Sequence, residues 1–346
     1  MNLTRWSALA AAGALVMAAA SGTAVAAAGA AARRATPLPT QVYAPYFETY
    51  QPGSITAVAQ QSGVQYYTLA FLQSEKRAPC TIFWDGDGKT PVSGGKYLTQ
   101  IKALRAGGGD VILSFGGYSA DSGGTELADS CGKVPAILRD YEQLVLTYGV
   151  SRLDFDIESR SLRNTIGIDR RNTAITELEA WATAHGRPLQ VSFTMPATAA
   201  GLTPSGLAVL ANAIAHGTRV DVVNIMTFDY YNGTTDMGKA AITAGEALHA
   251  QLAKLYPSKT SAQLYAMEGL TLMPGIDDNP DKAEVTTLSD TRQITAWASA
   301  HHIDTLSIWA IQRDNGGCPG TNGSDSCSGV KQATWAFSRI LQRFDN

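Results

Sequence analysis

The chain has 346 residues, of which 45% are hydrophobic, and a formal net charge of −3 with a pI near 6.0. This composition is sufficient for a sizeable apolar core, and the mildly acidic balance gives no reason to expect a nucleic acid or an anionic membrane as a partner. We expect a monomer. Basic residues are scattered, with no cluster longer than the pairs Arg33-Arg34 and Arg170-Arg171.

Residues 1–26 have the pattern of a secretory signal peptide. An apolar, alanine-rich run follows Arg5, and Ala24-Val25-Ala26 supplies the small residues of a cleavage site. The run is too short to favour a membrane span. Residues 27–40 form an Ala, Arg and Pro segment that we predict to be a disordered linker. Residues 41–346 are then expected to be a single folded domain of an exported, extracellular protein.

The four cysteines agree with an oxidising compartment. Cys318 and Cys327 flank a loop rich in Gly, Ser and Asn and can pair locally, which would leave Cys80 and Cys131 as the second pair. Three connectivities are possible, and the sequence does not choose among them. No Cys-x-x-Cys or His-x-x-x-His accompanies these cysteines, and the five histidines are interpreted as surface or satisfied residues. We therefore predict no metal and no cofactor.

Apolar stretches rich in β-branched and aromatic residues alternate with helical stretches along the domain. The predicted strands are 41–48, 66–73, 110–117, 152–158, 189–196, 220–229, 270–276 and 305–314. Helices are predicted at 95–105, 134–148, 168–184, 204–216, 239–255 and 291–301. This alternation predicts an α/β fold of the (β/α)8 or TIM barrel type. A doubly wound open sheet is the alternative, but no Gly-x-Gly-x-x-Gly follows the first strand.

Residues 153–158 read Leu-Asp-Phe-Asp-Ile-Glu, and strand geometry places Asp154, Asp156 and Glu158 on one face. The apolar residues of the other face, and the predicted helix just before, indicate a buried strand of a parallel sheet. Carboxyl groups so arranged repel one another, and burial would raise their proton affinity. The alternative is an edge strand whose acids face water.

In a TIM barrel the active site lies where the strands end. The predicted strand ends carry Gly116 and Gly117, Glu158, Met195, the segment Met226 to Tyr231, and Trp309. We expect the polar and aromatic residues among them to converge. The two glycines permit close approach of the backbone, although a plain turn after the strand is an equal explanation.

The motifs Ser114-Phe115-Gly116-Gly117, Asp154-x-Asp156-x-Glu158, Met226-Thr227-Phe228-Asp229-Tyr230 and Ser307-Ile308-Trp309 resemble glycoside hydrolase family 18, the chitinases. The closing stretches Trp309 to Asp314 and Cys327 to Val330 are similar to a bacterial branch whose sixth strand reads Met-Thr-Met-Asp-Tyr. The resemblance covers residues 41 to 344, and its specific part is the Asp-x-Asp-x-Glu spacing. It implies a secreted hydrolase that cleaves β-1,4 bonds in chitin or N-acetylglucosamine oligosaccharides.

The resemblance also implies a role for each acid. Glu158 would protonate the leaving oxygen and later activate water, while Asp156 would hold the 2-acetamido group that acts as the nucleophile. Asp154 would tune this pair, and Asp229 would orient the acetamido group or the acid. Trp309 would form the apolar floor under the reacting sugar. Further cavity walls are expected at Tyr46, Phe71, Met195 and Met226, with packing in the core as the alternative.

Two positions depart from the family pattern. Ser151 stands where many members have another aspartate, and Phe228 stands where many have a tyrosine that binds the acetamido oxygen. Tyr230 is the expected substitute for that tyrosine. Rival functions are an endo-β-N-acetylglucosaminidase, a lysozyme-like glycosidase, and a non-catalytic binding barrel, which the retained Glu158 disfavours. The sequence does not decide between endo and exo action.

Overall fold

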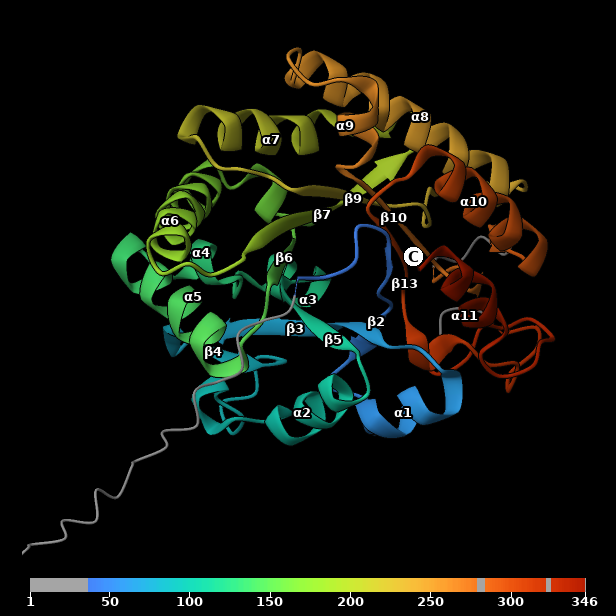
Figure 1. Ribbon diagram of the computed structural model, residues 1–346, viewed down its shortest axis with the longest axis horizontal. Helices are drawn as coiled ribbons and strands as arrows, with labels where there is room; N and C mark the ends of the chain where they lie inside the picture. The colour runs from blue at the N-terminus through green and yellow to red at the C-terminus, as the bar shows by residue number, and fades with distance from the viewer. Residues whose placement is uncertain (1–36, 279–283, 322–324, 346) are drawn as a thin grey trace, which may run out of the picture. The chain divides into compact units, whose positions relative to one another are not determined.

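The computed structural model describes residues 37–278, 284–321 and 325–345. The predicted signal peptide, residues 1–26, and residues 27–36 of the predicted linker lie outside these ranges. Figure 1 looks down a ring of strands that is surrounded by helices. In the part of the chain that is described, no helix is long and apolar enough to cross a membrane.

The barrel consists of eight parallel strands, the first of which is split into the halves β1 and β2. In the described residues the hydrogen-bonded order is β1, β13, β10, β9, β7, β6, β5, β3 and β2, so the two halves close the ring. The split falls at Pro45, which has no N–H to donate to a ladder. The strands are β1 (Val42–Tyr43), β2 (Tyr46–Glu48), β3 (Tyr66–Glu75), β5 (Asp110–Gly116), β6 (Arg152–Asp156), β7 (Gln190–Thr198), β9 (Val222–Met226), β10 (Glu268–Leu272) and β13 (Thr305–Ile308). The predicted (β/α)8 barrel is confirmed.

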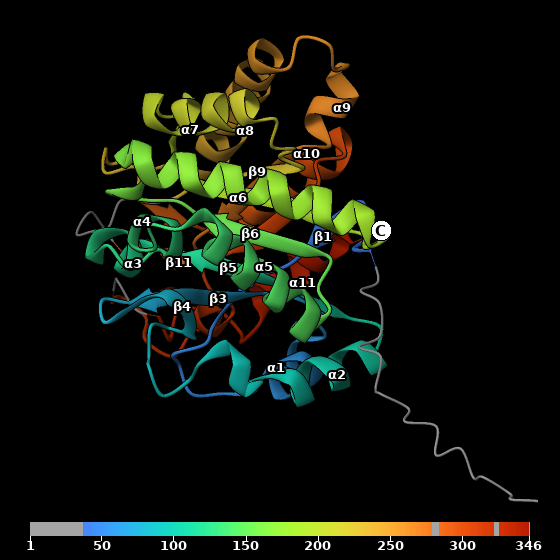
Figure 2. The same cartoon turned by 90° about the vertical axis from the view of Figure 1, so that its left-hand side faces the viewer.

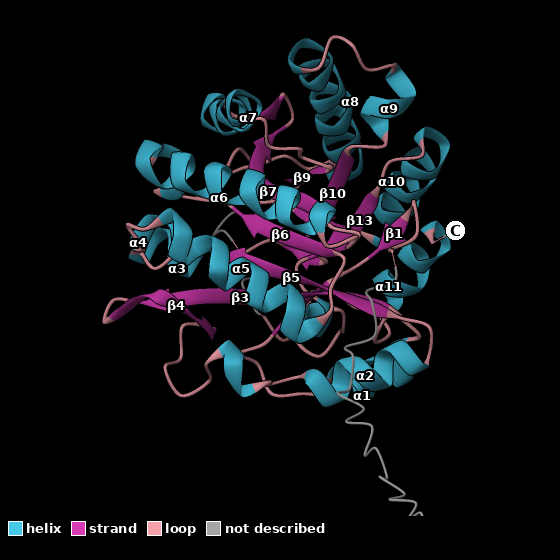
Figure 3. Ribbon diagram, turned by 60° about the vertical axis from the view of Figure 1, so that its left-hand side comes forward, coloured by secondary structure: helices cyan, strands magenta, loops and turns pink. Residues whose placement is uncertain are grey.

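Helices cover the outer face of these strands, as the cyan and magenta elements of Figure 3 show. Figure 2 shows α5 and α6 running side by side. The helices are α1 (Ile55–Ser62), α2 (Leu98–Ala106), α3 (Tyr118–Gly123), α4 (Leu127–Ser130), α5 (Val134–Tyr148), α6 (Thr165–Ala184), α7 (Pro204–His216), α8 (Met237–Leu255), α9 (Ser261–Tyr265), α10 (Leu288–His301) and α11 (Ala336–Leu341). Single 3-10 turns lie at Val92–Gly94, Ser161–Arg163, Ile311–Arg313 and Gln342–Phe344.

Several boundaries differ from the sequence prediction for local reasons. The predicted helix at 95–105 begins only at Leu98, because Tyr97 has a positive φ of 72°. The helix predicted from 168 starts earlier, since the Asn164 side chain accepts the Gly167 N–H at 3.2 Å and caps it.

The structure also contains short antiparallel strands that the sequence analysis does not predict. They are β4 (Ala78–Trp84) on β3, β8 (Gly201–Leu202) on β7, and the pair β11 (Gly275–Ile276) and β12 (Val285–Thr286).

The side chains of β6 divide between two environments. Leu153, Phe155 and Ile157 are at most 1% exposed and point toward the helices, where Phe155 stacks on Phe115 at 5.3 Å between ring centroids. Asp154 and Asp156 point into the barrel, as alternation requires. The interior face is therefore polar and the outer face apolar, and the acidic residues of the strand are buried rather than at a solvated edge.

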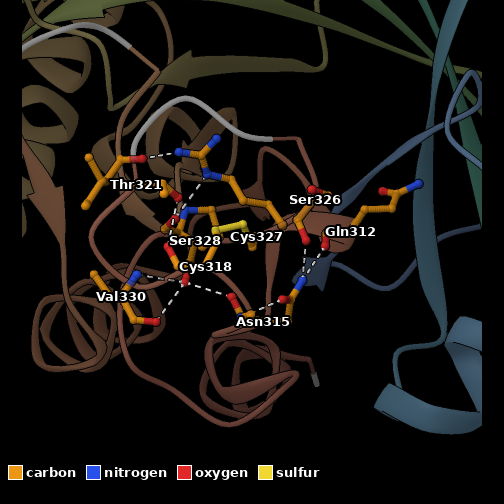
Figure 4. The surroundings of a disulfide bond; sticks show 12 residues. Gln312, Asn315, Cys318, Thr321, Ser326, Cys327, Ser328 and Val330 are labelled. Atoms are coloured by element: carbon orange, nitrogen blue, oxygen red, sulfur yellow. Dashed lines mark hydrogen bonds between the residues drawn. A yellow bond between two sulfur atoms is a disulfide. The ribbon is translucent and has the colours of Figure 1, made fainter.

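Two disulfides resolve the connectivity that the sequence left open. Cys80 on β4 bonds to Cys131 just after α4, and Cys318 bonds to Cys327. Figure 4 shows the second bridge and its surroundings. There the Asn315 side chain donates to the carbonyl of Gln312 at 3.0 Å, and the hydroxyl of Ser328 donates to the carbonyl of Asn315 at 3.0 Å. The contact of Ser328 joins one end of the disulfide loop to the segment after β13.

Candidate active site

A cavity of about 590 Å³ lies where the barrel strands end, because its walls come from residues at or just beyond the ends of β3, β6, β7, β9, β10 and β13. Acidic and aromatic side chains dominate the lining. The acids are Asp85, Asp156, Glu158, Asp229, Asp278 and Asp325, and the aromatic residues are Tyr46, Tyr50, Phe71, Tyr118, Phe228, Tyr231 and Trp309. A carboxyl-rich pocket with aromatic walls suits a neutral, hydroxylated ligand with apolar C–H faces.

Asp154 lies beneath this cavity and is held by hydroxyl groups. Its Oδ2 accepts the hydroxyl of Ser114 at 2.6 Å, and its Oδ1 accepts those of Ser192 at 2.7 Å and Thr194 at 2.9 Å. The Tyr46 hydroxyl, with one proton to give, lies 3.1 Å from Asp154 Oδ2 and 2.9 Å from Thr194 Oγ1. Burial raises the pKa of Asp154, and these donors oppose that increase by stabilising the ionised form.

Asp156 has a different environment, although it lies only two residues farther along the same face. It is 3% exposed, and its Oδ1 has no hydrogen-bond partner among the described residues. Burial raises its pKa well above the usual range, and the carboxyl groups of Glu158, Asp154 and Asp121 raise it further. Asp156 is therefore the member of the cluster that most readily holds a proton.

Glu158 follows the end of β6 and reaches the cavity. It is half-buried, and the pKa of its carboxyl is raised to about 7, mainly by burial. A hydrogen bond from the backbone N–H of Tyr118 lowers this pKa, and the charge of Asp229 raises it. A carboxylic acid in this range can both give and take a proton near neutral pH. The arrangement has the electrostatic requirement of a general acid and base.

Asp229 follows the end of β9 and lines the same cavity as Glu158. Its φ is 51°, and its N–H donates to Asp277 Oδ2 at 2.7 Å. Asp277 is fully buried, and burial raises its pKa to about 8. The positive φ is a strained conformation for an aspartate, and the buried partner below it fixes the loop in that form.

The apolar floor of the cavity is a group of three aromatic rings. Phe71 and Trp309 stack with 5.4 Å between ring centroids and 15° between planes, and Tyr46 lies 5.6 Å from Trp309. Trp309 is half-buried and lines the cavity. Met226 is also in the wall, so four of the predicted substrate-binding residues line the cavity, in addition to the three predicted acids named above.

Other predicted substrate contacts lie elsewhere. Met195 is fully buried in the core, because it has the parity of the outward-facing side chains of β7, and Thr194 lines the cavity instead. Tyr230 packs against Met237 and Ala240 at the start of α8, and its neighbour Tyr231 lines the cavity. Strand alternation in the sequence could have separated Thr194 from Met195. Periodicity in the sequence could not have shown that Tyr231, rather than Tyr230, lines the cavity, because Tyr231 lies in an irregular loop with a φ of 53°.

Gly116 and Gly117 do not line the cavity, and their contribution is close backbone packing. A Cβ on Gly116 would lie 2.1 Å from the carbonyl oxygen of Asp156, and a Cβ on Gly117 would lie 2.5 Å from the ring of Phe71. Both residues also have positive φ values, 93° and 80°. These glycines allow the end of β5 to approach both β6 and the aromatic floor.

Comparisons with known proteins agree on one family. Residues 40–282 match the family described as Glycosyl hydrolases family 18. The chain is 36% identical over 320 residues to "Probable bifunctional chitinase/lysozyme" of Escherichia coli (strain K12), covering 88% of this chain and 35% of that protein. It is 36% identical over 288 residues to "Endochitinase 11" of Metarhizium anisopliae, covering 80% of this chain and 53% of that one. The chain thus spans well under two thirds of the length of these curated relatives.

Solved structures give the same result for the fold. The catalytic domain of the hyperthermophilic chitinase from Pyrococcus furiosus superposes with a TM-score of 0.79 at 30% identity, covering 90% of this chain and 97% of that one. Catalytic-site mutants of active domain 2 of that thermostable chitinase, complexed with chito-oligosaccharides, match with the same TM-score. Since the family match extends over residues 40–282, more than half of the sequence, the chain belongs to the glycosyl hydrolases of family 18.

Proposed function

We propose that this protein is a secreted chitinase that hydrolyses β-1,4 bonds between N-acetylglucosamine units with retention of configuration. The observation that carries the proposal is the half-buried Glu158 carboxyl, with its pKa raised to about 7, at a cavity that has an aromatic floor. Such an acid is still largely protonated just below neutral pH and can donate to a leaving oxygen. The names of the relatives and the bound chito-oligosaccharides of one structural neighbour point to the same substrate class.

The reaction proceeds in two steps, with the substrate's own 2-acetamido group in place of a protein nucleophile. In the first step Glu158 protonates the glycosidic oxygen, the acetamido oxygen attacks the anomeric carbon, and the bond to the leaving sugar breaks. A cyclic oxazolinium ion remains. In the second step Glu158 takes a proton from water, and the water oxygen attacks the same carbon and reopens the ring, which restores the original anomeric configuration.

Asp156 is the group that would hold the acetamido N–H. Its Oδ1 is buried, lacks a partner among the described residues, and belongs to a side chain that lines the cavity. Because Asp154 already accepts several hydroxyl donors, the proton that relieves repulsion within the cluster would be on Asp156 in the free protein. The positive charge of the oxazolinium would then favour the ionised form of Asp156.

The remaining contacts position the sugar. Trp309, packed on Phe71, offers a ring face on which the C–H face of a pyranose can lie. Phe228 lines the cavity but has no hydroxyl, and Tyr231 takes the place of Tyr230 as the proposed donor to the acetamido oxygen. Burial and the charges of Asp229 and Glu158 raise the pKa of Tyr231, which agrees with a hydroxyl on the side of the cavity that carries these two acids.

The decisive experiment is Glu158→Gln, measured on soluble N-acetylglucosamine oligomers. The variant keeps the shape of the side chain but has no proton to donate, so kcat should fall by about 10² to 10⁴ fold. Glu177→Gln, on the exposed face of α6, is the matched control and should hydrolyse the oligomers at the wild-type rate. Wild-type turnover by the Glu158 variant would contradict the proposal.

The stereochemistry of the product tests the substrate-assisted route separately. Retention predicts that freshly released sugar is the β anomer, and proton NMR within the first minutes resolves the two anomers before they equilibrate. An initial α anomer would rule out the oxazolinium route while leaving Glu158 as the acid.

A lysozyme-like activity is a second candidate, because one relative is named a probable bifunctional chitinase/lysozyme. The proposed residues would be the same, and a cleft that admits the lactyl ether of the alternating sugar of peptidoglycan would be required. Turnover of peptidoglycan and of chitin oligomers by one preparation compares the two activities directly. Secretion is supported by the two disulfides and by the pattern of residues 1–26.

A further inference from the structure

Asp121 is a buried acid beside the proposed proton donor, and the family motifs do not include it. It lies in α3, the short helix that follows Gly117, and it is fully buried. Its backbone N–H donates to the carbonyl of Gly117 at 3.0 Å. Its Oδ2 accepts the backbone N–H of Glu158, and its Oδ1 has no partner among the described residues.

The hydrogen bond between Asp121 and Glu158 is one of several that join α3 to the segment after β6. The backbone N–H of Tyr118, the first residue of α3, bonds to the side chain of Glu158. The hydroxyl of Ser122 donates to that of Ser159 at 3.1 Å, and a guanidinium nitrogen of Arg160 donates to the carbonyl of Ser122 at 3.2 Å. Glu158 is therefore held at its side chain and at its backbone by the same six-residue helix.

The backbone of Glu158 requires such a contact, because the strand ends there. The preceding N–H, that of Ile157, still bonds to the carbonyl of Thr194 on β7 at 2.8 Å. At Ser159 the chain turns with a φ of 44°, so the N–H of Glu158 is the first one beyond the ladder. A buried N–H without a partner costs about 1 to 3 kcal/mol, and Asp121 supplies the acceptor.

We propose that Asp121 is a positioning residue that fixes the backbone of Glu158 and so directs its carboxyl at the glycosidic oxygen. This inference rests on the proposed function of Glu158. The contact is to the main chain, so Asp121 itself never meets the substrate: it is absent from the cavity lining, whereas Glu158 is in it. Its effect on hydrolysis is transmitted entirely through the position of Glu158.

The role requires an acceptor oxygen rather than a negative charge. The charged groups that face Asp121 are Glu126, Arg171, Glu158 and Asp156, most of them acidic. Burial and the charge of Glu126 raise the pKa of Asp121 well above its usual range. A neutral amide of the same shape can accept the same N–H, so asparagine is expected to replace Asp121 in this role.

The test compares three variants of the full chain on N-acetylglucosamine oligomers. Asp121→Leu keeps the volume but removes the acceptor, and we expect kcat to fall by about 10² fold with KM within about twofold of wild type, since misplacement of a catalytic group by about 1 Å costs that much. Asp121→Asn should restore kcat to within about threefold of wild type. Asp129→Ala is the control, because Asp129 pairs with the buried Arg171 and accepts the hydroxyl of Ser161 but does not contact Glu158. This variant should lower the melting temperature and leave kcat unchanged.

The outcomes separate this inference from the proposed function. Wild-type kcat in Asp121→Leu, or an Asn variant as impaired as the Leu variant, would overturn the positioning role. A large rise in KM would also overturn it, because that result would indicate direct substrate contact. If the Leu variant does not fold, Asp121→Ala is measured against Asp121→Asn by the same criteria. Activity that survives Glu158→Gln would instead contradict the proposed function itself.

Discussion

Substitution of Glu158 by glutamine should make the protein more stable at neutral pH while strongly reducing hydrolysis. Burial raises the pKa of Glu158 from 4.5 to about 7. Between these two pH values the unfolded chain has released this proton and the folded chain has kept it. The unfolded state then binds fewer protons, so the free energy of unfolding decreases as pH rises through this window and is level above it.

The size of the effect follows from the same two values. At about 1.36 kcal/mol per pH unit, the difference between 4.5 and about 7 corresponds to a loss of about 3 kcal/mol of stability above pH 7, as an upper limit because Glu158 interacts with its acidic neighbours. Glutamine has the shape of the protonated acid and does not titrate. The variant should therefore match the wild type near pH 4 and exceed it by up to about 3 kcal/mol near pH 8.

Urea unfolding at pH 4, 6 and 8 measures this difference, with tryptophan fluorescence as the signal and the disulfides left intact. Glu177→Gln again serves as the control, because it makes the same chemical change at an exposed position of α6. A stability difference between the Glu158 variant and wild type that is equal at all three pH values would refute the argument that folding raises the pKa of this carboxyl.

Three further results are expected. Asp229→Asn removes a charge that raises the pKa of Glu158, so the alkaline limb of the pH profile of kcat/KM should move to lower pH, and an unmoved limb would show that the two acids do not interact. Ser192→Ala removes a hydroxyl that donates to the buried Asp154, so the free energy of unfolding measured by chemical denaturation should fall by about 1 to 3 kcal/mol. Because a hydrogen bond contributes at least roughly 0.5 kcal/mol, a smaller decrease would contradict the proposed contact. Removal of the Cys80–Cys131 bridge, which spans 51 residues, should cost about 4 kcal/mol by loop entropy, and a double Cys→Ala variant with an unchanged melting temperature would contradict this.

The barrel and its acidic strand could be predicted from sequence because they depend on periodicity. Alternation in residues 153–158 places the acids on one face, and the regular succession of strands and helices indicates the closed sheet. Met195 was predicted as a cavity wall, but its side chain is on the outer face of β7 and packs in the core. The alternation of side chains along a strand could have corrected this prediction. Tyr231 and Asp121 were beyond this method. They lie in loops or in a six-residue helix, where positive φ values and contacts between distant segments decide the direction of a side chain.

The interior of the barrel shows how a strand with three acids can remain buried. Hydroxyl donors from β5 and β7 stabilise the ionised form of Asp154 and oppose the rise in its pKa that burial causes. Asp156 receives no such donor, and Glu158 only a backbone N–H. The two carboxyls with the least compensation thus line the cavity, where under the proposed mechanism an acetamido N–H and a glycosidic oxygen would contact them. Stabilisation of Asp156 by an added hydroxyl would therefore be expected to strengthen the fold and weaken substrate binding together.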